Sequence, residues 1–135
     1  IGAKLPKHKI DGKSIVNLIK STSDKSPQEA YYFYMGRQLQ AIRMGNWKLH
    51  FPHGYRTMAG KPGGKGGIPT KYSQARIGVS LFDLDKDIGE TTDVKETHPE
   101  ILAKMQQLGE AMRTELGDNK RQGKGQRQPG RLAAR

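Results

Sequence analysis

Residues 79–116 read VSLFDLDKDIGETTDVKETHPEILAKMQQLGEAMRTEL, and this stretch decides the fold. Its first part, Val79–Leu84, is a short apolar run that predicts a strand. After an acidic turn, apolar residues recur at the spacing of one face of a helix. The stretch therefore predicts a strand, a turn and an amphipathic helix that packs on a sheet. The residues of the helical stripe are Ile101, Met105, Leu108, Met112 and Leu116.

Both ends of this helix carry boundary signals. Thr97 and Glu100 stand three positions apart and predict a capping box, with Pro99 tolerated in the first helical turn. Gly117 follows the last apolar residue of the stripe, at a position where glycine commonly ends a helix. We therefore expect the helix to lie between these two signals.

Three strand candidates precede this stretch. Ala30–Met35 is dense in aromatic residues, Gln38–Met44 follows it, and Trp47–Phe51 comes third. The two-residue connections between them contain Gly or Asn, which suit the turns of β-hairpins. Together with the strand at 79–84, they predict a four-stranded antiparallel sheet with the long helix on one face. The expected fold class is therefore α+β.

The third of these strands separates two kinds of side chain. Trp47, Leu49 and Phe51 share one face, because side chains alternate along a strand. Lys48 and His50 share the other face. We expect the apolar face to pack against the helix.

Residues 1–29 carry few signals of regular structure. Within them, Ser14–Lys20 can form a short helix or turn. Such a helix would bury Ile15, Leu18 and Ile19.

Length and composition limit the class of protein. The chain has 135 residues, of which 33% are hydrophobic, so it fits one small domain with one modest core. It contains no cysteine, which excludes disulfides, thiolate chemistry and cysteine-type zinc sites. It also contains no apolar run long enough to span a membrane. Because Ile1 is not an initiator Met, we interpret the chain as a fragment or a processed piece.

The net charge of +11 is concentrated in two glycine-rich segments. Residues 54–78 contain seven glycines, two prolines and no acid, and they predict a long loop that is either functional or mobile. The tail at 118–135 has the composition of a disordered segment. It could bind nucleic acid, but it has no aromatic residue for base stacking. A solvated tail without a specific partner is therefore favoured.

One acidic segment resembles the start of a calcium-binding loop. Asp83, Asp85 and Asp87 alternate as such a loop requires, but Ile88 stands at position six and Val94 at position twelve. The motif needs Gly and Glu at these two positions. We therefore reject a calcium site here and expect an acidic turn between strand and helix.

One glycine-rich segment, GKPGGKGG at 60–67, superficially resembles a phosphate-binding loop. However, Lys65 is followed by Gly66 rather than Ser or Thr, and no helix follows. A mobile cationic loop is the better interpretation, and its Lys and Arg side chains could contact an anionic substrate.

His50 and His53 flank Phe51-Pro52 at the start of this long loop. Two histidines three positions apart could bind a metal ion, but no third ligand stands nearby in the sequence. Two interpretations remain: ordinary surface or partly buried histidines, or residues that line a site formed with another domain. Lys48 shares the face of His50 and would add positive charge there.

Taken together, residues 31–116 resemble the C-terminal subdomain of the sulfatase family, close to the arylsulfatase A group. The resemblance rests on an ordered set of segments: YYFY, LQAIRMGNWKLHF, a long variable loop, LFDLDKDIGETTDV and HPEILAKM. Ile10-Asp11-Gly12 with Ser14-Ile15 is also similar to the segment that enters this subdomain from the catalytic domain. The resemblance thus covers residues 1–117 and leaves the basic tail outside.

The resemblance implies that the chemistry lies outside this chain. In the family, an α/β catalytic domain binds one calcium ion and carries a formylglycine, made from the Cys or Ser of a C/S-x-P-x-R motif. That motif is absent here. We therefore expect calcium and formylglycine in a missing catalytic domain of the same parent chain. This chain alone is expected to hold no catalytic residue and no metal and to be inactive, and the parent is expected to be secreted or periplasmic.

The resemblance also implies domain divisions and pocket residues. We expect a leading segment from the catalytic domain at 1–29, a sulfatase C-terminal-like subdomain at 30–117, and a basic disordered tail at 118–135. The subdomain would complete the enzyme's fold and help line the pocket for a sulfate-ester substrate. No membrane partner is expected, and an exposed sheet face would allow the isolated fragment to self-associate. By position, the pocket candidates are Lys48, His50, His53, Arg56, Lys61 and Lys65.

An alternative function of another class stays open. A small basic module could bind a polyanion, either nucleic acid or sulfated polysaccharide. The binding residues would then lie in the basic tail or in the cationic loop.

Overall fold

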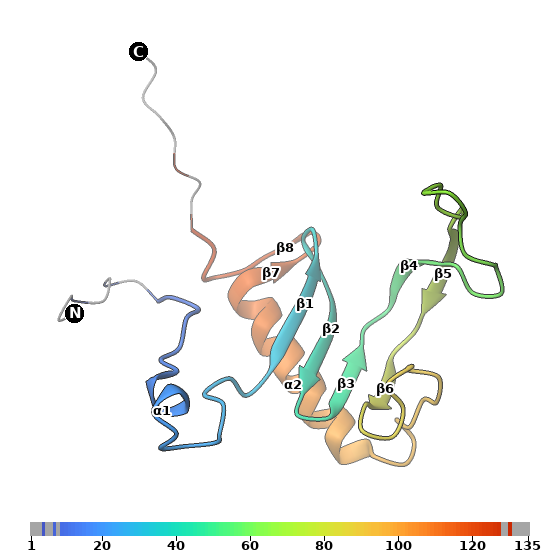
Figure 1. The fold of residues 1–135 in the computed structure, drawn as a ribbon. Helices are drawn as coiled ribbons and strands as arrows, with labels where there is room; N and C mark the ends of the chain where they lie inside the picture. The colour runs from blue at the N-terminus through green and yellow to red at the C-terminus, as the bar shows by residue number, and fades with distance from the viewer. Residues whose placement is uncertain (1–3, 5–6, 8, 128–129, 131–135) are drawn as a thin grey trace.

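The computed structural model describes residue 4, residue 7, residues 9–127 and residue 130. Its elements run from a short N-terminal helix to a small C-terminal hairpin (Figure 1). In chain order they are α1 (Val16–Ile19), β1 (Tyr31–Met35), β2 (Gln38–Met44), β3 (Trp47–His50), β4 (His53–Thr57), β5 (Ser73–Ile77), β6 (Ser80–Asp83), α2 (Pro99–Leu116), β7 (Gly117–Asp118) and β8 (Arg121–Gln122).

Four strands form one antiparallel sheet in the order β1-β2-β3-β6. The helix α2 lies across one face of this sheet (Figure 1). The predicted α+β fold is therefore confirmed, and β2 has the bounds that the sequence predicted. Gly36 (φ 58°) and Gly45 (φ 60°) occupy the turns between the first three strands, in the left-handed region that glycine adopts without strain.

The core lies between the sheet and α2. Met105, at the centre of the predicted helical stripe, is 0% exposed, whereas Leu116 at the end of the stripe is 39% exposed. The predicted apolar face of β3 also packs into the core, because Leu49 is 0% exposed and Trp47 is partly buried against the cluster. The buried members of this core are Leu39, Ile42, Leu49, Phe51, Leu81 and Met105.

A register shift between β1 and β2 turns Leu39 into this core. Phe33 pairs with Ala41, but the next residue, Tyr34, pairs with Leu39, so Gln40 is the extra residue of a β-bulge. Without the bulge, Leu39 would share a face with Ala41, because side chains alternate with a period of two. The bulge places Leu39 on the helix side, where it is 1% exposed.

The N-terminus of α2 does not use the predicted capping box, and that prediction is wrong. His98 is the N-cap residue, and no side chain caps a helical N–H there. The chain turns immediately before the helix, and both the N–H and the hydroxyl of Thr97 donate to the carbonyl of Val94 (3.1 and 2.9 Å). Pro99 is the first residue of the helix, as expected from its missing N–H.

The glycine-rich segment is more regular than the sequence predicted. Its two flanks, β4 and β5, pair as an antiparallel ribbon, with His53 opposite Ile77 and Thr57 opposite Ser73. A loop at 58–72 joins them. The ribbon extends beyond the end of the four-stranded sheet (Figure 1). The long loop is thus present, but it is carried on two strands.

The chain folds back after α2. Gly117 has φ 91° and ends the helix, as predicted, and β7 then pairs with β8. The carboxylate of Asp118 accepts hydrogen bonds from the N–H of Leu39 (3.1 Å) and from Nε of Arg113 (2.7 Å). The sequence did not predict this hairpin. Residues 128–129 and 131–135 of the basic tail lie outside the described residues.

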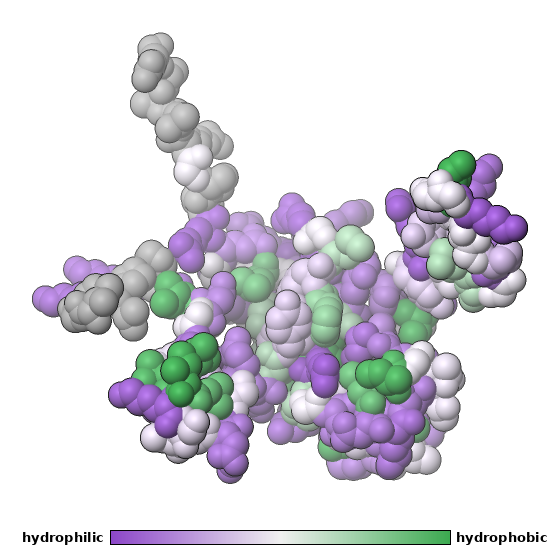
Figure 2. All heavy atoms as spheres, in the orientation of Figure 1, coloured by the Kyte–Doolittle hydropathy of each residue, from purple (hydrophilic) through white to green (hydrophobic). Residues whose placement is uncertain are grey.

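The short helix α1 is present within the predicted segment Ser14–Lys20, but the predicted burial of two apolar residues of that segment is wrong. Ile15 is 51% exposed and Ile19 is 73% exposed, and only Leu18 is partly buried. The helix has four residues and lies beside the sheet rather than on it (Figure 1), and apolar side chains gather over it in Figure 2. Neither α1 nor α2 combines the length and apolar character that crossing a membrane requires.

Candidate functional site

A polar cluster lies on the open face of the sheet, opposite α2. Lys48 and His50 point to this face from β3, as the alternation predicted. The carboxylate of Glu90 reaches both residues: Oε1 lies 2.5 Å from Lys48 Nζ, and Oε2 lies 2.6 Å from His50 Nε2. All three side chains are largely shielded, with 19%, 13% and 26% of their respective surfaces exposed. We call Lys48, His50 and Glu90 the Glu90 cluster.

The acidic turn after β6 positions Glu90. The carboxylate of Asp87 accepts hydrogen bonds from the backbone N–H groups of Thr91 (2.6 Å) and Thr92 (2.7 Å), so it holds the turn together. Glu90 has φ 55°, a left-handed conformation that non-glycine residues rarely adopt. Its bonds to Lys48 and His50 offset the cost of this conformation.

Glu90 and His50 differ in charge at neutral pH. Burial raises the pKa of Glu90, but hydrogen bonds from Lys48 and His50 outweigh burial and bring the pKa below its ordinary value of 4.5. Burial lowers the pKa of His50 below its ordinary value of 6.5, and the hydrogen bond with Glu90 offsets only part of this effect. At pH 7 Glu90 is therefore ionised and His50 is neutral.

One nitrogen of His50 has no partner. The neutral ring donates from Nε2 to Glu90, which leaves Nδ1 as an acceptor. Nδ1 is buried and has no hydrogen-bond partner among the described residues. Leaving a buried acceptor unpaired costs about 1–3 kcal/mol. This atom therefore marks a position at which a hydrogen-bond donor is expected.

His53 extends the cluster toward the ribbon. It is buried, with 7% of its surface exposed, and its Nδ1 donates to the carbonyl of Phe51 (2.7 Å). Its ring stacks on that of His50, with centroids 5.4 Å apart and planes 19° from parallel. The structure thus brings Lys48, His50 and His53 together at the end of β3.

The other three pocket candidates lie apart from the histidines. Arg56 pairs with Gln74 across the ribbon, and it lies on the ribbon face opposite His53, because the two residues are an odd number of positions apart in one strand. Lys61 and Lys65 lie in the loop beyond the ribbon strands. The six candidates therefore form one compact group and one extended group.

Sequence reasoning missed Glu90 as a member of the site. It lies 40 residues from His50 in the chain, and no local pattern connects the two. The sequence offers no signal beyond the position of Glu90 after Gly89 in the acidic segment.

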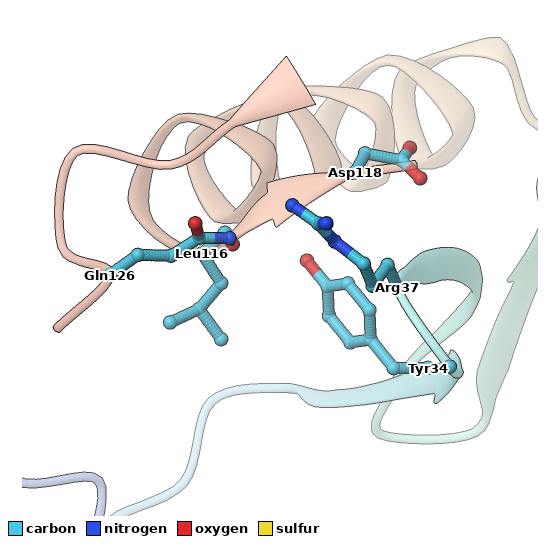
Figure 3. A pocket seen from close by; sticks show the side chains of 6 residues that line it. Tyr34, Arg37, Leu116, Asp118 and Gln126 are labelled. Carbon is cyan, nitrogen blue, oxygen red and sulfur yellow. The ribbon is translucent and has the colours of Figure 1, made fainter. Parts of the chain in front are cut away.

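Two of the cavities in the described structure lie away from the Glu90 cluster. One, of about 370 Å³, lies between the β1–β2 turn and β7, and Figure 3 shows Tyr34 and Arg37 reaching toward β7 there. The hydroxyl of Tyr34 donates to the carbonyl of Gly117 (3.0 Å), so this region serves to attach the C-terminal hairpin. The second, of about 590 Å³, lies between residues 9–13 and the end of α2. None of the six candidates lines either cavity.

A family model described as the C-terminal region of aryl-sulfatase matches residues 26–131. This match covers most of the chain, including the four-stranded sheet and α2. The chain therefore belongs to the sulfatase family, as its C-terminal region, and the resemblance inferred from the sequence is confirmed.

Two relatives show how much of a longer protein this region represents. Steryl-sulfatase of Mus musculus is 28% identical in an alignment of 129 positions that covers 85% of this chain and 21% of the mouse protein. A solved structure, described with the metabolism of multiple glycosaminoglycans by Bacteroides thetaiotaomicron, superposes with a TM-score of 0.52 at 22% identity. The superposition covers 82% of this chain and 22% of the chain in the solved structure. At 22% identity it supports the fold alone. The chain spans about a fifth of each relative.

The family implies a calcium ion and a formylglycine. The C/S-x-P-x-R motif that yields formylglycine is absent from the sequence. Within residues 9–127 and the other described positions, no three His, Asp or Glu side chains gather where they could hold a metal ion.

Proposed function

We propose that this chain is the C-terminal part of a sulfuric ester hydrolase, in which it completes the fold and lines the substrate pocket. Family membership supports the first part of the proposal. The observation that carries the second part is the group of Lys48, His50 and His53 at one end of the open sheet face, with a buried Nδ1 that lacks a donor.

The proposed contribution of this group is hydrogen bonding rather than net charge. Lys48 is paired with Glu90, so its positive charge is largely balanced. His50 presents the Nδ1 acceptor, and the ring of His53, whose Nδ1 donates to the carbonyl of Phe51, stacks beside it. An acceptor at this position suits a hydroxyl group of the alcohol that carries the sulfate. The mouse relative favours a sulfate ester on an organic hydroxyl, since it is a steryl-sulfatase.

We further propose that the bond-breaking chemistry belongs to a catalytic domain of the same parent chain. That domain would hold the formylglycine and the calcium ion. The motif needed for formylglycine is absent here, and the chain spans about a fifth of its relatives. The part proposed for this chain is to complete the enzyme and orient the substrate.

Two measurements test the proposal. The coding sequence upstream of Ile1 is expected to encode a C/S-x-P-x-R motif, and an upstream reading frame without one would contradict the assignment. The 135-residue chain alone is expected to show no hydrolysis of an aryl sulfate above a buffer control. Turnover by the purified chain would show that its chemistry does not depend on another domain.

The role of the pocket group needs variants of the parent protein. His50→Ala is expected to raise KM for the sulfate ester about tenfold with a smaller change in kcat, because it removes a binding contact rather than a reacting group. Gln106→Ala, on the exposed side of α2, is the matched control and should leave both constants unchanged. An unchanged KM in His50→Ala would remove this residue from the pocket.

A further inference from the structure

The ribbon formed by β4, the loop at 58–72 and β5 carries positive charge without compensation. It contains five Lys or Arg residues and no acid. In the part of the chain that the structure describes, none of the five forms an ion pair, although other cations do. Arg121 in the C-terminal hairpin, for example, lies 2.5 Å from Glu110. The ribbon cations are Arg56, Lys61, Lys65, Lys71 and Arg76.

The strand pairing places two arginines on one face of the ribbon. Gly54 pairs with Arg76, and Arg56 pairs with Gln74, so Arg56, Gln74 and Arg76 share a face. The two arginines are diagonal neighbours, about 7–8 Å apart at the backbone. A guanidinium presents two parallel N–H donors to an oxyanion, so this spacing suits two adjacent sulfate groups or one held from both sides.

The loop continues the same positive surface. Nζ of Lys61 donates to the carbonyl of Lys71 (3.1 Å), and the hydroxyl of Thr70 donates to the carbonyl of Pro62 (2.9 Å). These bonds join the two sides of the loop, and the exposed Lys65 lies near its tip. In Figure 2 the surface at the far end of the ribbon is mostly hydrophilic or neutral.

The ribbon is long compared with a single sulfate ester. Two paired strands of five residues each span about 16 Å, before the loop is counted. One sulfate of a small aryl or steroid ester could engage only one position on such a surface. Cations distributed over this length suit an anionic group that repeats along a polymer.

We propose that the β4–β5 ribbon binds a sulfated polysaccharide, and that this polymer class is the substrate of the parent enzyme. The inference rests on the proposed function, because the ester to be cleaved would lie at His50 and His53 while neighbouring sulfates engage the ribbon. His53 is the first residue of β4, so the pocket group adjoins the ribbon. Arg56 and Arg76 lie on the ribbon face opposite His53, so a polymer that reaches both groups passes around the ribbon edge. The nearly balanced charge of the Glu90 cluster leaves the ribbon as the source of attraction for the polymer.

Nucleic acid is the competing polyanion, and the ribbon strands favour it less. Proteins that bind single strands place aromatic side chains for base stacking beside the cations that contact phosphates. In the strands, the one aromatic residue besides His53 is Tyr55, and it lies on the face opposite Arg56 and Arg76. Within the two strands, base stacking and phosphate contact would therefore fall on different faces. The exposed Tyr72 directly precedes β5, so single-stranded DNA is included in the test below.

The test measures binding of the 135-residue chain to heparin, a polysulfated glycan, over a range of salt concentrations. The ribbon variant carries Arg56→Gln, Lys65→Gln and Arg76→Gln. The control carries Lys120→Gln, Lys124→Gln and Arg127→Gln and loses the same number of charges from the C-terminal segment. We expect the ribbon variant to bind at least about tenfold more weakly, with a shallower salt dependence by about two to three counterions, and the control to change by less than about threefold.

Each outcome supports or overturns the inference. Weaker binding in the control than in the ribbon variant would assign the polyanion site to the tail. Equal affinity for heparin, for unsulfated hyaluronan and for single-stranded DNA would overturn the choice of a sulfated glycan. If the strand substitutions lower the unfolding midpoint, the loop variant Lys65→Gln, Lys71→Gln replaces them and is expected to weaken binding about fivefold or more.

Failure of this inference is distinguishable from failure of the proposed function. A parent enzyme that hydrolyses sulfate esters but whose chain shows no ribbon-dependent heparin binding would refute the ribbon alone. An upstream sequence without the C/S-x-P-x-R motif would refute the proposed function, whatever the chain binds.

Discussion

The ring of Phe51 occupies the space in which a side chain at Gly109 of α2 would lie. A Cβ built on Gly109 would overlap Cζ of Phe51 and would also lie 3.2 Å from Cδ1 of Ile42. Glycine is among the least favourable residues in the middle of a helix, so its presence here has a packing cause. The helix approaches the sheet closely because this position carries no side chain.

Gly109→Ala is therefore expected to destabilise the chain. In an exposed helix the change would stabilise by about 1 kcal/mol, but the overlap with the Phe51 ring is expected to reverse the sign and cost about 1–3 kcal/mol. Urea unfolding followed by circular dichroism measures the difference. Gln106→Ala on the exposed side of α2 should stay within about 0.5 kcal/mol of the wild type. A more stable Gly109→Ala would show that the ring can move aside.

Met105→Asp is expected to abolish cooperative unfolding of the domain. Met105 is 0% exposed at the centre of the core, and an unpaired carboxylate there has no solvent and no partner. Loss of more than about 4 kcal/mol exceeds what a small domain of this kind can tolerate. Gln106→Asp, one position along the helix and exposed, is the control. A melting temperature that is unchanged in Met105→Asp would mean that the helix packs through another face.

Asp118→Ala is expected to release the C-terminal hairpin from the sheet. The substitution removes the acceptor of both the Leu39 N–H and the Arg113 guanidinium, and the loss of a shielded acceptor costs about 1–3 kcal/mol. Hydrogen exchange should accelerate at the Leu39 amide, and the urea midpoint should fall. Lys120→Ala in the same hairpin should leave both measurements unchanged. Retained protection of the Leu39 amide would contradict the role of Asp118.

Stability is expected to fall in two steps as the pH is lowered. The pKa of folded His50 lies below 6.5, so from about pH 6.5 downward the unfolded chain binds a proton that the folded chain does not, and stability is lost. The pKa of folded Glu90 lies below 4.5, so stability present above pH 4.5 is lost as the pH falls through the folded pKa. Urea midpoints between pH 7.5 and 3 measure both steps.

His50→Gln isolates the upper step. The variant cannot take up the proton, so its stability should be flatter between about pH 6.5 and 5, while the lower step remains. A wild-type chain that becomes more stable as the pH falls from 7 to 5 would contradict the neutral state assigned to His50.

Local signals were sufficient for most of the fold. The alternation in Trp47–Phe51 and the helical stripe around Met105 each reflect burial of one face of an element, and burial imposes a period on the sequence. The turns at Gly36 and Gly45 could also be predicted, because a backbone with positive φ favours glycine. These features depend on neighbours only a few positions away.

Features that depend on distant partners could not be predicted in this way. Thr97 had the sequence of a capping residue, but its hydroxyl bonds to Val94 in the turn before the helix. Glu90 joins the site only because the chain returns to β3, and Asp118 acts on Leu39, 79 positions earlier. In each case the competing contact is tertiary, and no short window of sequence contains both partners.

Because of the bulge at Gln40, the number of residues in β2 decides which face of the sheet Leu39 occupies. Deleting this one residue would restore simple alternation and rotate Leu39 out to the open face. Inserting one residue beside Gln40 would likewise turn the side chains on one side of the insertion to the opposite face of the sheet. We therefore expect homologous chains to vary in the identity of this residue but to align without gaps through β2. The loop at 58–72 is the place where insertions and deletions can accumulate without disturbing the core.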